Sequence, residues 1–280
     1  DGVDCEGVVA DNGSTDGTRE VVAQWSARHP AVRLVDASTR RGPSAARNVG
    51  AAAARGDALA FCDADDVVGD GWLPSMAAAL REDAAVAGAL DFAALNDRSG
   101  GMGTAGGFAL GFLPGMRGAG SGNLGVRRDA FDAIGGFDER LRVGEDVDLC
   151  VRLQLAGHRL APRDDAVVHV RLRGGIIAAF RHAWAFGRAD RQLRHRFAPV
   201  SRAIASGAWS PPGTGEGPVA AGSPTSPDGN APASPPPARW RRLRHPRSID
   251  ASAVARRWGR RGGETFGRVD RTLPQVDPPT

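Results

Sequence analysis

The sequence predicts an α/β fold, in which a mostly parallel sheet is flanked by helices and followed by a disordered C-terminal tail. Three observations lead to this prediction. Strand-like and helix-like segments alternate along the first 198 of the 280 residues. Hydrophobic residues make up 41% of the chain, which is enough for a buried core. Acidic motifs follow the hydrophobic segments, as ligand-binding groups do at the carboxyl ends of parallel strands.

The first half of the chain alternates regularly between the two kinds of element. We expect strands near residues 8–10, 32–35, 58–62 and 86–90, and helices near residues 14–28, 44–55 and 72–81. The first helix can be capped by Ser14 or Thr15, because their side-chain oxygens accept hydrogen bonds from free backbone N–H groups. Alanine dominates the second helix and favours it by its high helix propensity.

A glycine-rich stretch at residues 99–122 separates the two halves. Its composition indicates a segment too flexible for the core, which is either a mobile loop over an acceptor or a poorly ordered insertion. Beyond it we expect strands at residues 123–126 and 167–170, and helices at residues 127–134, 145–156 and 176–193.

The predicted domain covers residues 1–198, and residues 199–280 form the predicted tail. Residues 199–238 are rich in Pro, Gly and Ser and cannot bury enough apolar surface to offset the entropy of ordering. Residues 239–261 are rich in arginine and carry Trp240 and Trp258. This segment could touch an anionic membrane surface or remain a solvated tail, and we consider nucleic acid an unlikely partner.

Cysteine usage and hydropathy predict the compartment. The three cysteines are far apart in the sequence, which is typical of reduced core thiols. No run of about 18 apolar residues predicts a transmembrane helix, and the acidic start of the chain does not look like a secretory leader. We expect a cytoplasmic protein, with peripheral contact at the inner membrane face as an option.

The motif Asp11–Thr18 follows the first expected strand and opens the first expected helix. An aspartate at the end of a strand can accept hydrogen bonds from a nucleotide base or a ribose. Helix capping explains the same residues without any ligand. The motif alone does not decide between the two interpretations.

The motif Asp63-Ala64-Asp65-Asp66 follows the hydrophobic segment 58–62. Three carboxylates in four residues repel one another, and half-burying them is costly unless a cation lies between them. Mg²⁺ and Mn²⁺ prefer oxygen ligands and often combine one or two carboxylates with substrate phosphates. The sequence therefore favours a metal site here over a solvated acidic loop.

Two further candidates follow later in the chain. Glu145 and Asp146 open an amphipathic helix. Each could serve as a general base, because a neighbouring carboxylate raises the pKa, or could simply complement the helix dipole. His169 lies in an expected strand and is either structural or a third metal ligand.

Five short motifs taken together resemble those of the inverting family 2 glycosyltransferases, which have the Rossmann-like GT-A fold. In this sequence they occupy residues 11–18, 42–50, 63–66, 135–139 and 144–149, in the order that the family has. The resemblance covers about residues 3–195. It implies sugar transfer from a nucleotide-sugar donor to the hydroxyl of a saccharide, lipid-linked or small-molecule acceptor, with a divalent metal as cofactor.

The resemblance also implies roles for single residues. On the donor side, Asp11 contacts the nucleotide base, Arg47 lies near the diphosphate, and Asp63 faces the sugar or ribose. Asp65 binds the metal, and His169 completes the metal shell.

On the catalytic side of the resemblance, Asp146 is the base and Glu145 supports it. Members of the family normally carry an apolar strand and a helix before the first motif, whereas only residues 1–7 precede the strand here. An inactive or truncated GT-A-like binding module is therefore one alternative. A metal-dependent nucleotidyltransferase is another, although it would need a basic glycine-rich loop after the first strand.

Overall fold

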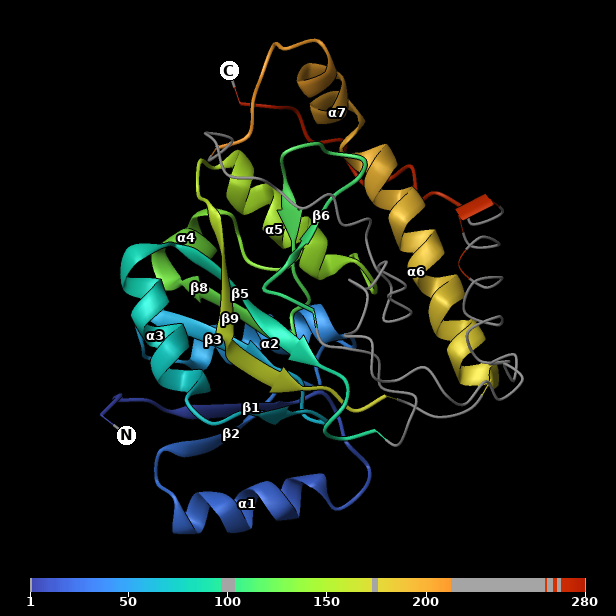
Figure 1. Cartoon of the computed structure of the whole chain (residues 1–280). Helices are drawn as coiled ribbons and strands as arrows, with labels where there is room; N and C mark the ends of the chain where they lie inside the picture. Colours follow the sequence, from blue (N-terminus) through green and yellow to red (C-terminus); the bar gives the residue numbers. More distant parts are fainter. Residues whose placement is uncertain are drawn as a thin grey trace, which may run out of the picture.

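A computed structural model describes residues 2–96, 104–172, 176–212, 260, 264–265 and 268–279. Within them, a five-stranded sheet forms the centre of the molecule, and helices cover both of its faces (Figure 1). The strand order is β3-β8-β5-β9-β4, with bounds Ala58–Cys62, Asn123–Arg127, Ala85–Asp91, Leu160–His169 and Val67–Val68. The α/β prediction is thus confirmed.

The direction of the strands differs from the prediction. Strands β3, β5 and β9 run in one direction, but β5·β9 is the one parallel pair of neighbours in this sheet, whereas the pairs β3·β8, β5·β8 and β4·β9 are antiparallel. A parallel neighbour needs a helical crossover that returns the chain to the same edge. The segment between β5 and β8 contains no helix among its described residues, so β8 enters the sheet in the opposite direction.

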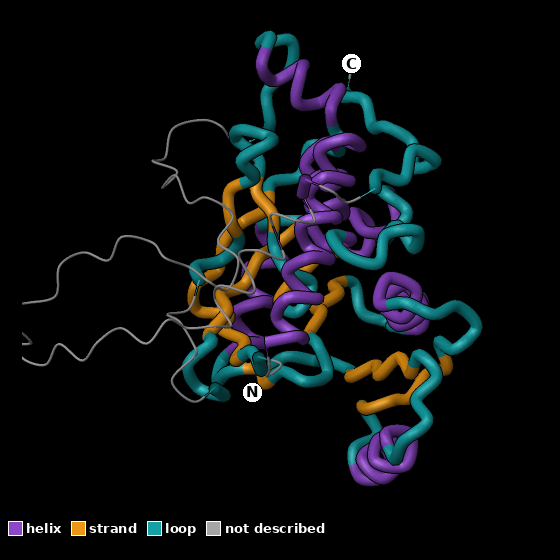
Figure 2. The backbone as a smooth tube through the Cα atoms, turned by 90° about the vertical axis from the view of Figure 1, so that its right-hand side faces the viewer, coloured by secondary structure: helices purple, strands orange, loops and turns teal. Residues whose placement is uncertain are grey.

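A second, two-stranded parallel sheet is formed by β1 (Gly7–Asp11) and β2 (Val32–Asp36). Helix α2 (Pro43–Ala53) lies on one side of it and helix α1 (Thr18–Arg28) on the other (Figures 1 and 2). Neither strand pairs with the five-stranded sheet in the described part of the chain. Helix α1 buries none of its side chains, and it contributes little to the core.

Strand β5 shows which helices cover each face of the five-stranded sheet, because its successive side chains point to opposite faces. Val86 packs against helix α3 (Trp72–Glu82) through Met76 and Leu80. Ala85 and Ala87 belong to the cluster on the opposite face. That cluster also contains residues of helices α4 (Arg128–Ala133) and α5 (Glu145–Leu155).

The prediction that the glycine-rich stretch is too flexible for the core is wrong for its described part. Strands β6 (Phe108–Ala109) and β7 (Arg117–Gly118) form a hairpin there. Its buried side chains join a third core cluster and are Leu110, Leu113 and Met116. A Cβ at Gly106 would lie 2.3 Å from the carbonyl oxygen of Ala87. Glycine is needed here for close backbone approach and not for mobility. Residues 97–103 lie outside the described part.

The folded part also extends beyond residue 198. Helix α6 (Ile176–Arg196) is followed by helix α7 (Ala198–Ala205), whose Val200 is fully buried. The C-terminal end then returns to α6, where Leu273 is buried and the amide of Val276 donates to the carbonyl oxygen of Arg196 at 2.9 Å. This end of the predicted tail is therefore ordered, whereas residues 213–259 lie outside the described part.

The contact between the C-terminal end and α6 could not be predicted from the sequence, because it joins residues that are far apart in the chain. Gln192 of α6 exchanges two hydrogen bonds with the backbone of Asp270. No helix in the described part of the chain is long and apolar enough to cross a membrane.

Candidate active site

The acidic motif lies directly after strand β3, as expected. Asp63, Asp65 and Asp66 each offer a carboxylate oxygen within 4.8 Å of the others. Burial and the charges of the two neighbouring aspartates raise the pKa of Asp66, although its Oδ1 accepts a hydrogen bond from the amide of Arg171 at 2.9 Å. Such an all-oxygen set with mutual repulsion fits Mg²⁺ or Mn²⁺.

Arg47 joins three of the predicted motifs. It projects from helix α2, with its Nη2 atom 2.7 Å from Oδ1 of Asp63 and its Nη1 atom 3.0 Å from Oε1 of Glu145. Its guanidinium also lies over the ring of Phe137, 5.6 Å from the centroid. The acidic motif after β3 and the start of α5 are therefore neighbours, although about eighty residues separate them in the sequence.

Helix α5 begins with the two predicted catalytic carboxylates. Gly144 precedes them with a φ of +82°, a left-handed conformation that turns the chain into the helix. Glu145 is only 7% exposed, and burial together with the charge of Asp146 raises its pKa to about 7. Burial also raises the pKa of Asp146. The pair can accept a proton near neutral pH, which is the requirement for a general base.

The loop at residues 119–122 completes the site between the two acidic groups. A Cβ at Gly122 would lie 3.1 Å from Oδ2 of Asp63, and one at Gly120 would lie 4.0 Å from Oδ2 of Asp146. Ser121 between them is buried, and its backbone hydrogen bond to Asp146 opposes the rise in pKa. Sequence reading missed this contribution. The glycines on both sides of Ser121 were the signal that the backbone approaches another group closely.

Asp11 lies at the end of β1, away from the contacts of Arg47. Hydrogen bonds from the hydroxyl and the amide of Ser14 hold the pKa of Asp11 below its usual range, and Nη1 of Arg19 lies 2.9 Å from its Oδ2. Helix α1 begins at Thr18, so the predicted capping by Ser14 or Thr15 is wrong. Asp16 instead accepts a hydrogen bond from the amide of Thr18, because a short Asx turn forms there.

His169 ends strand β9 and pairs with Asp91, which the sequence analysis did not single out. The Nδ1 atom of His169 lies 2.7 Å from Oδ2 of Asp91, its partner in the parallel register of β5 and β9. The acidic group with metal-ligand spacing in the described residues does not include His169. A carboxylate on one ring nitrogen is the usual arrangement of a metal-binding histidine. The role of His169 as a metal ligand therefore stays a prediction.

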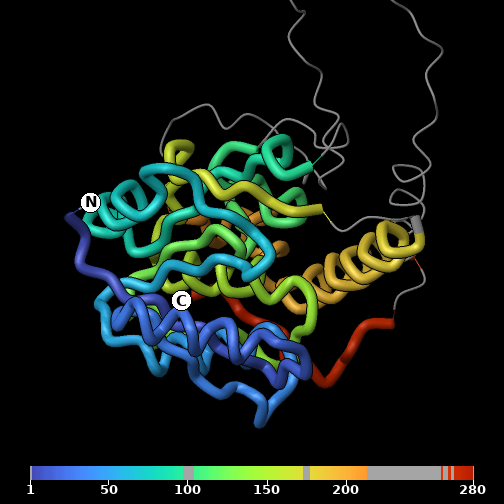
Figure 3. Tube along the Cα trace, turned by 90° about the horizontal axis from the view of Figure 1, so that it is seen from below, coloured from blue at the N-terminus to red at the C-terminus, as the bar shows by residue number. Residues whose placement is uncertain are grey.

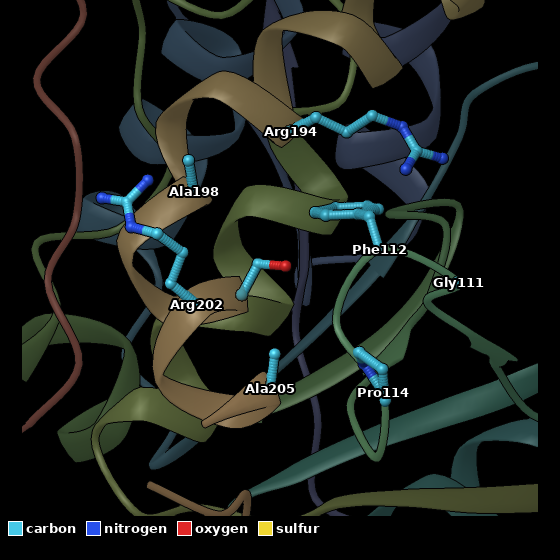
Figure 4. Close-up of a pocket in the computed structure, with 8 residues that line it drawn as sticks. Gly111, Phe112, Pro114, Arg194, Ala198, Arg202 and Ala205 are labelled. Atoms are coloured by element: carbon cyan, nitrogen blue, oxygen red, sulfur yellow. The ribbon is translucent and has the colours of Figure 1, made fainter. Parts of the chain in front are cut away.

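A pocket of about 410 Å³ lies elsewhere, between helices α6 and α7 and the loop after β6 (Figure 4). The guanidinium of Arg194 lies over the ring of Phe112, 5.1 Å from its centroid. Arg202 and Ser201 line the same pocket from α7. None of the predicted site residues lines it, so it is distinct from the acidic site.

The chain is similar to known proteins in both sequence and structure. Residues 1–134 match the family model described as glycosyl transferase family 2. Two similar curated proteins, both from Rhizobium meliloti (strain 1021), are the succinoglycan biosynthesis proteins ExoA, 32% identical over 70% of this chain, and ExoO, 33% identical over 71%. This chain spans 63% and 62% of their lengths, respectively.

Two solved structures share the fold, each with a TM-score of 0.51. One is a mannosyltransferase from Pyrobaculum calidifontis in complex with GDP-Man and Mn²⁺, 23% identical over 71% of this chain and 59% of that chain. The other is GalNAc-T7 with UDP, GalNAc and Mn²⁺, 18% identical over 71% of this chain and 45% of that chain.

Proposed function

Because this chain belongs to glycosyl transferase family 2, we propose that it moves a sugar from a nucleotide-sugar donor to an acceptor hydroxyl, with inversion and with a divalent metal. One observation carries the proposal. Arg47 bridges the acidic motif and the start of α5, so that a cation-binding group and a proton-accepting group meet in one place. A glycosyl transfer needs both groups at the same anomeric carbon.

On the donor side, Arg47 and Asp63 bind the diphosphate and the sugar, and Asp11 binds the nucleotide base. Asp65 and His169 would hold the metal, which is Mg²⁺ or Mn²⁺. Both solved structures of the same fold contain Mn²⁺ with a nucleotide or a nucleotide sugar, which supports this part of the proposal. When bound, the cation supplies positive charge that stabilises the leaving diphosphate.

On the acceptor side, Asp146 accepts the proton of the attacking hydroxyl. The acceptor oxygen forms a bond to the anomeric carbon while the bond to the diphosphate breaks, and direct displacement inverts the configuration. Glu145 keeps Arg47 oriented through the 3.0 Å ion pair. The guanidinium can then move from Asp63 toward the developing negative charge of the leaving group.

The acceptor and the location are further parts of the proposal. Two similar proteins are named for succinoglycan biosynthesis, which supports a saccharide or a lipid-linked saccharide as acceptor. The cysteines of the described part, Cys5, Cys62 and Cys150, form no disulfide, which supports the cytoplasm as the place of the reaction.

Thermal unfolding tests the donor site directly. We expect Mn²⁺ together with one of UDP, GDP or dTDP to raise the melting temperature, because a ligand at 100 times its Kd stabilises the fold by about 2.7 kcal/mol. Asp65→Ala should remove the metal-dependent shift. Asp146→Asn should keep the shift and lower the rate of transfer by about 10²- to 10⁴-fold, the usual contribution of a general base.

Each outcome separates one part of the proposal from another. Full turnover in Asp146→Asn would exclude this residue as the base. A folded protein without a shift for any nucleotide would favour an inactive or truncated domain. A shift with a nucleoside triphosphate only, and none with a diphosphate, would favour the nucleotidyltransferase alternative.

A further inference from the structure

Helix α6 leaves large apolar side chains on its outer surface. Ile177 is 74% exposed and Phe180 is 40% exposed, although both belong to one helix of the folded domain. Trp184 lies one turn further on the same face, and its ring centroid is 6.1 Å from that of Phe180. We call these three residues the apolar face of α6. This half of the helix lies at the edge of the molecule (Figures 1 and 3).

The residues that the first half of α6 buries are small. Ala179 and Ala183 are buried, and a Cβ at Gly187 would lie 2.1 Å from the carbonyl oxygen of Arg260. A helix that is held only by its own domain buries its large apolar residues and exposes its small ones. The first half of α6 does the opposite, so its apolar face is suited to a partner outside the described part of the chain.

The charge of this half of α6 identifies the kind of partner. Arg181 and Arg188 are exposed beside the apolar face. No Asp or Glu occurs between residues 176 and 189, and the next acidic residue, Asp190, is paired with Arg194 at 2.7 Å. An apolar stripe that includes tryptophan, and whose charged neighbours on the same helix are arginines, matches an anionic lipid surface, where the ring lies at headgroup level.

The arginine-rich segment ends at the same helix. Arg260 contacts α6 at Gly187, and Arg191 donates a hydrogen bond to the carbonyl oxygen of Thr265 at 2.6 Å. In the sequence, residues 239–261 contain nine arginines and one acidic residue. Within the described part of the chain, Arg260 of this segment therefore lies beside α6.

We infer that the apolar face of α6 inserts into the headgroup region of an anionic lipid bilayer, with Arg181 and Arg188 contacting the lipid phosphates. The inference does not depend on the proposed glycosyl transfer. It also differs from binding by the arginine-rich segment alone, because it requires the apolar side chains. Further along α6, Ala189 and Leu193 pack against Gly144 at the start of α5, so binding would hold the acidic site near the membrane.

Vesicle sedimentation with the full-length chain tests the inference. We expect binding to vesicles that contain phosphatidylglycerol and little binding to pure phosphatidylcholine. The double variant Arg181→Gln/Arg188→Gln should bind about thirtyfold more weakly, since each arginine near an anionic surface contributes about 1 kcal/mol. The double variant Ile177→Ser/Phe180→Ser should lose binding to a similar extent.

Helix α1 offers a matched control, because Val21 and Trp25 are 54% and 51% exposed there. Val21→Ser/Trp25→Ser should bind vesicles as the parent does. Far-UV circular dichroism and the melting temperature show that each variant is folded. Parental binding by the folded Ile177→Ser/Phe180→Ser variant would overturn the inference. A second result would also overturn it: the parent is a dimer, the Ile177→Ser/Phe180→Ser variant is a monomer, and neither binds vesicles. The apolar face would then be covered by a second copy of the chain.

Discussion

The carboxylate of Glu145 has two neighbours with opposite effects on its charge. Burial and Asp146 disfavour the ionised form, whereas the guanidinium of Arg47 favours it. Burial has the larger effect, and the pKa rises from 4.5 to about 7. The proton-accepting pair therefore titrates near neutral pH, and its two protonation steps belong to the pair and not to either residue alone.

This rise in pKa predicts a pH-dependent stability. The folded protein binds the proton of Glu145 more tightly than the unfolded chain does. The contribution of Glu145 to the free energy of unfolding therefore falls as the pH rises from about 4.5 to about 7. Urea denaturation at a series of pH values should show this decline in the parent and a weaker one in Glu145→Gln. Equal slopes in the two proteins would mean that Glu145 does not titrate as described.

At the scale of elements, a buried ionic network fixes helix α5 against helix α6. Asp148 is fully buried in α5, and its carboxylate lies 2.7 Å from Nε of both Arg152 and Arg196. Arg196 comes from α6 and also pairs with Asp138 at 3.0 Å. Burial raises the pKa of Asp148, so the two arginines are needed to keep the carboxylate charged.

Removal of one partner from this network should lower the stability of the fold. We expect Arg196→Leu to lower the free energy of unfolding by about 3 kcal/mol, because an incompletely paired charge stays buried. Arg140→Leu is the control, since Arg140 pairs with the same Asp138 but its side chain is 50% exposed. It should cost about 1 kcal/mol or less. Urea denaturation measures both, and equal losses would contradict the buried role of Arg196.

At the scale of the whole molecule, the two ends of the described chain make very different contacts. Helix α1 buries none of its side chains, whereas the C-terminal residues 268–279 contact α6 through Val276 and the backbone of Asp270. The C-terminal end is thus packed on the rest of the domain, whereas the first helix is not. Helix α6 is held on one side by this end and on the other by the start of α5.

The C-terminal contact predicts a measurable share of stability. Leu273→Ala should lower the free energy of unfolding by about 2 kcal/mol, since Leu273 is only 3% exposed and its burial is lost. Asp277→Ala changes an exposed residue in the same segment and should leave stability within about 0.5 kcal/mol of the parent. Thermal or urea unfolding compares the two. A neutral Leu273→Ala would show that the segment does not pack stably in solution.

Much of the site could be predicted from the sequence because its signals are local. The acidic motif after strand β3 and the carboxylates at the start of α5 were recognised from short patterns of polarity beside hydrophobic runs. The contact of Arg47 with both groups was not predicted, because it joins residues that are far apart in the sequence. Asp91 was missed for the same reason, since only the register of β5 and β9 brings it to His169.

The sequence by itself determined the α/β class, the position of most helices and strands, and the candidate acidic groups. These depend on periodicity and composition within about ten residues. Only the tertiary structure decided the direction of β8, the packed state of the glycine-rich hairpin, and the return of the C-terminal end to α6. Each of these features depends on two segments that are far apart in the sequence and bury apolar surface against each other. The free energy of that burial depends on both segments together, so neither segment alone predicts it.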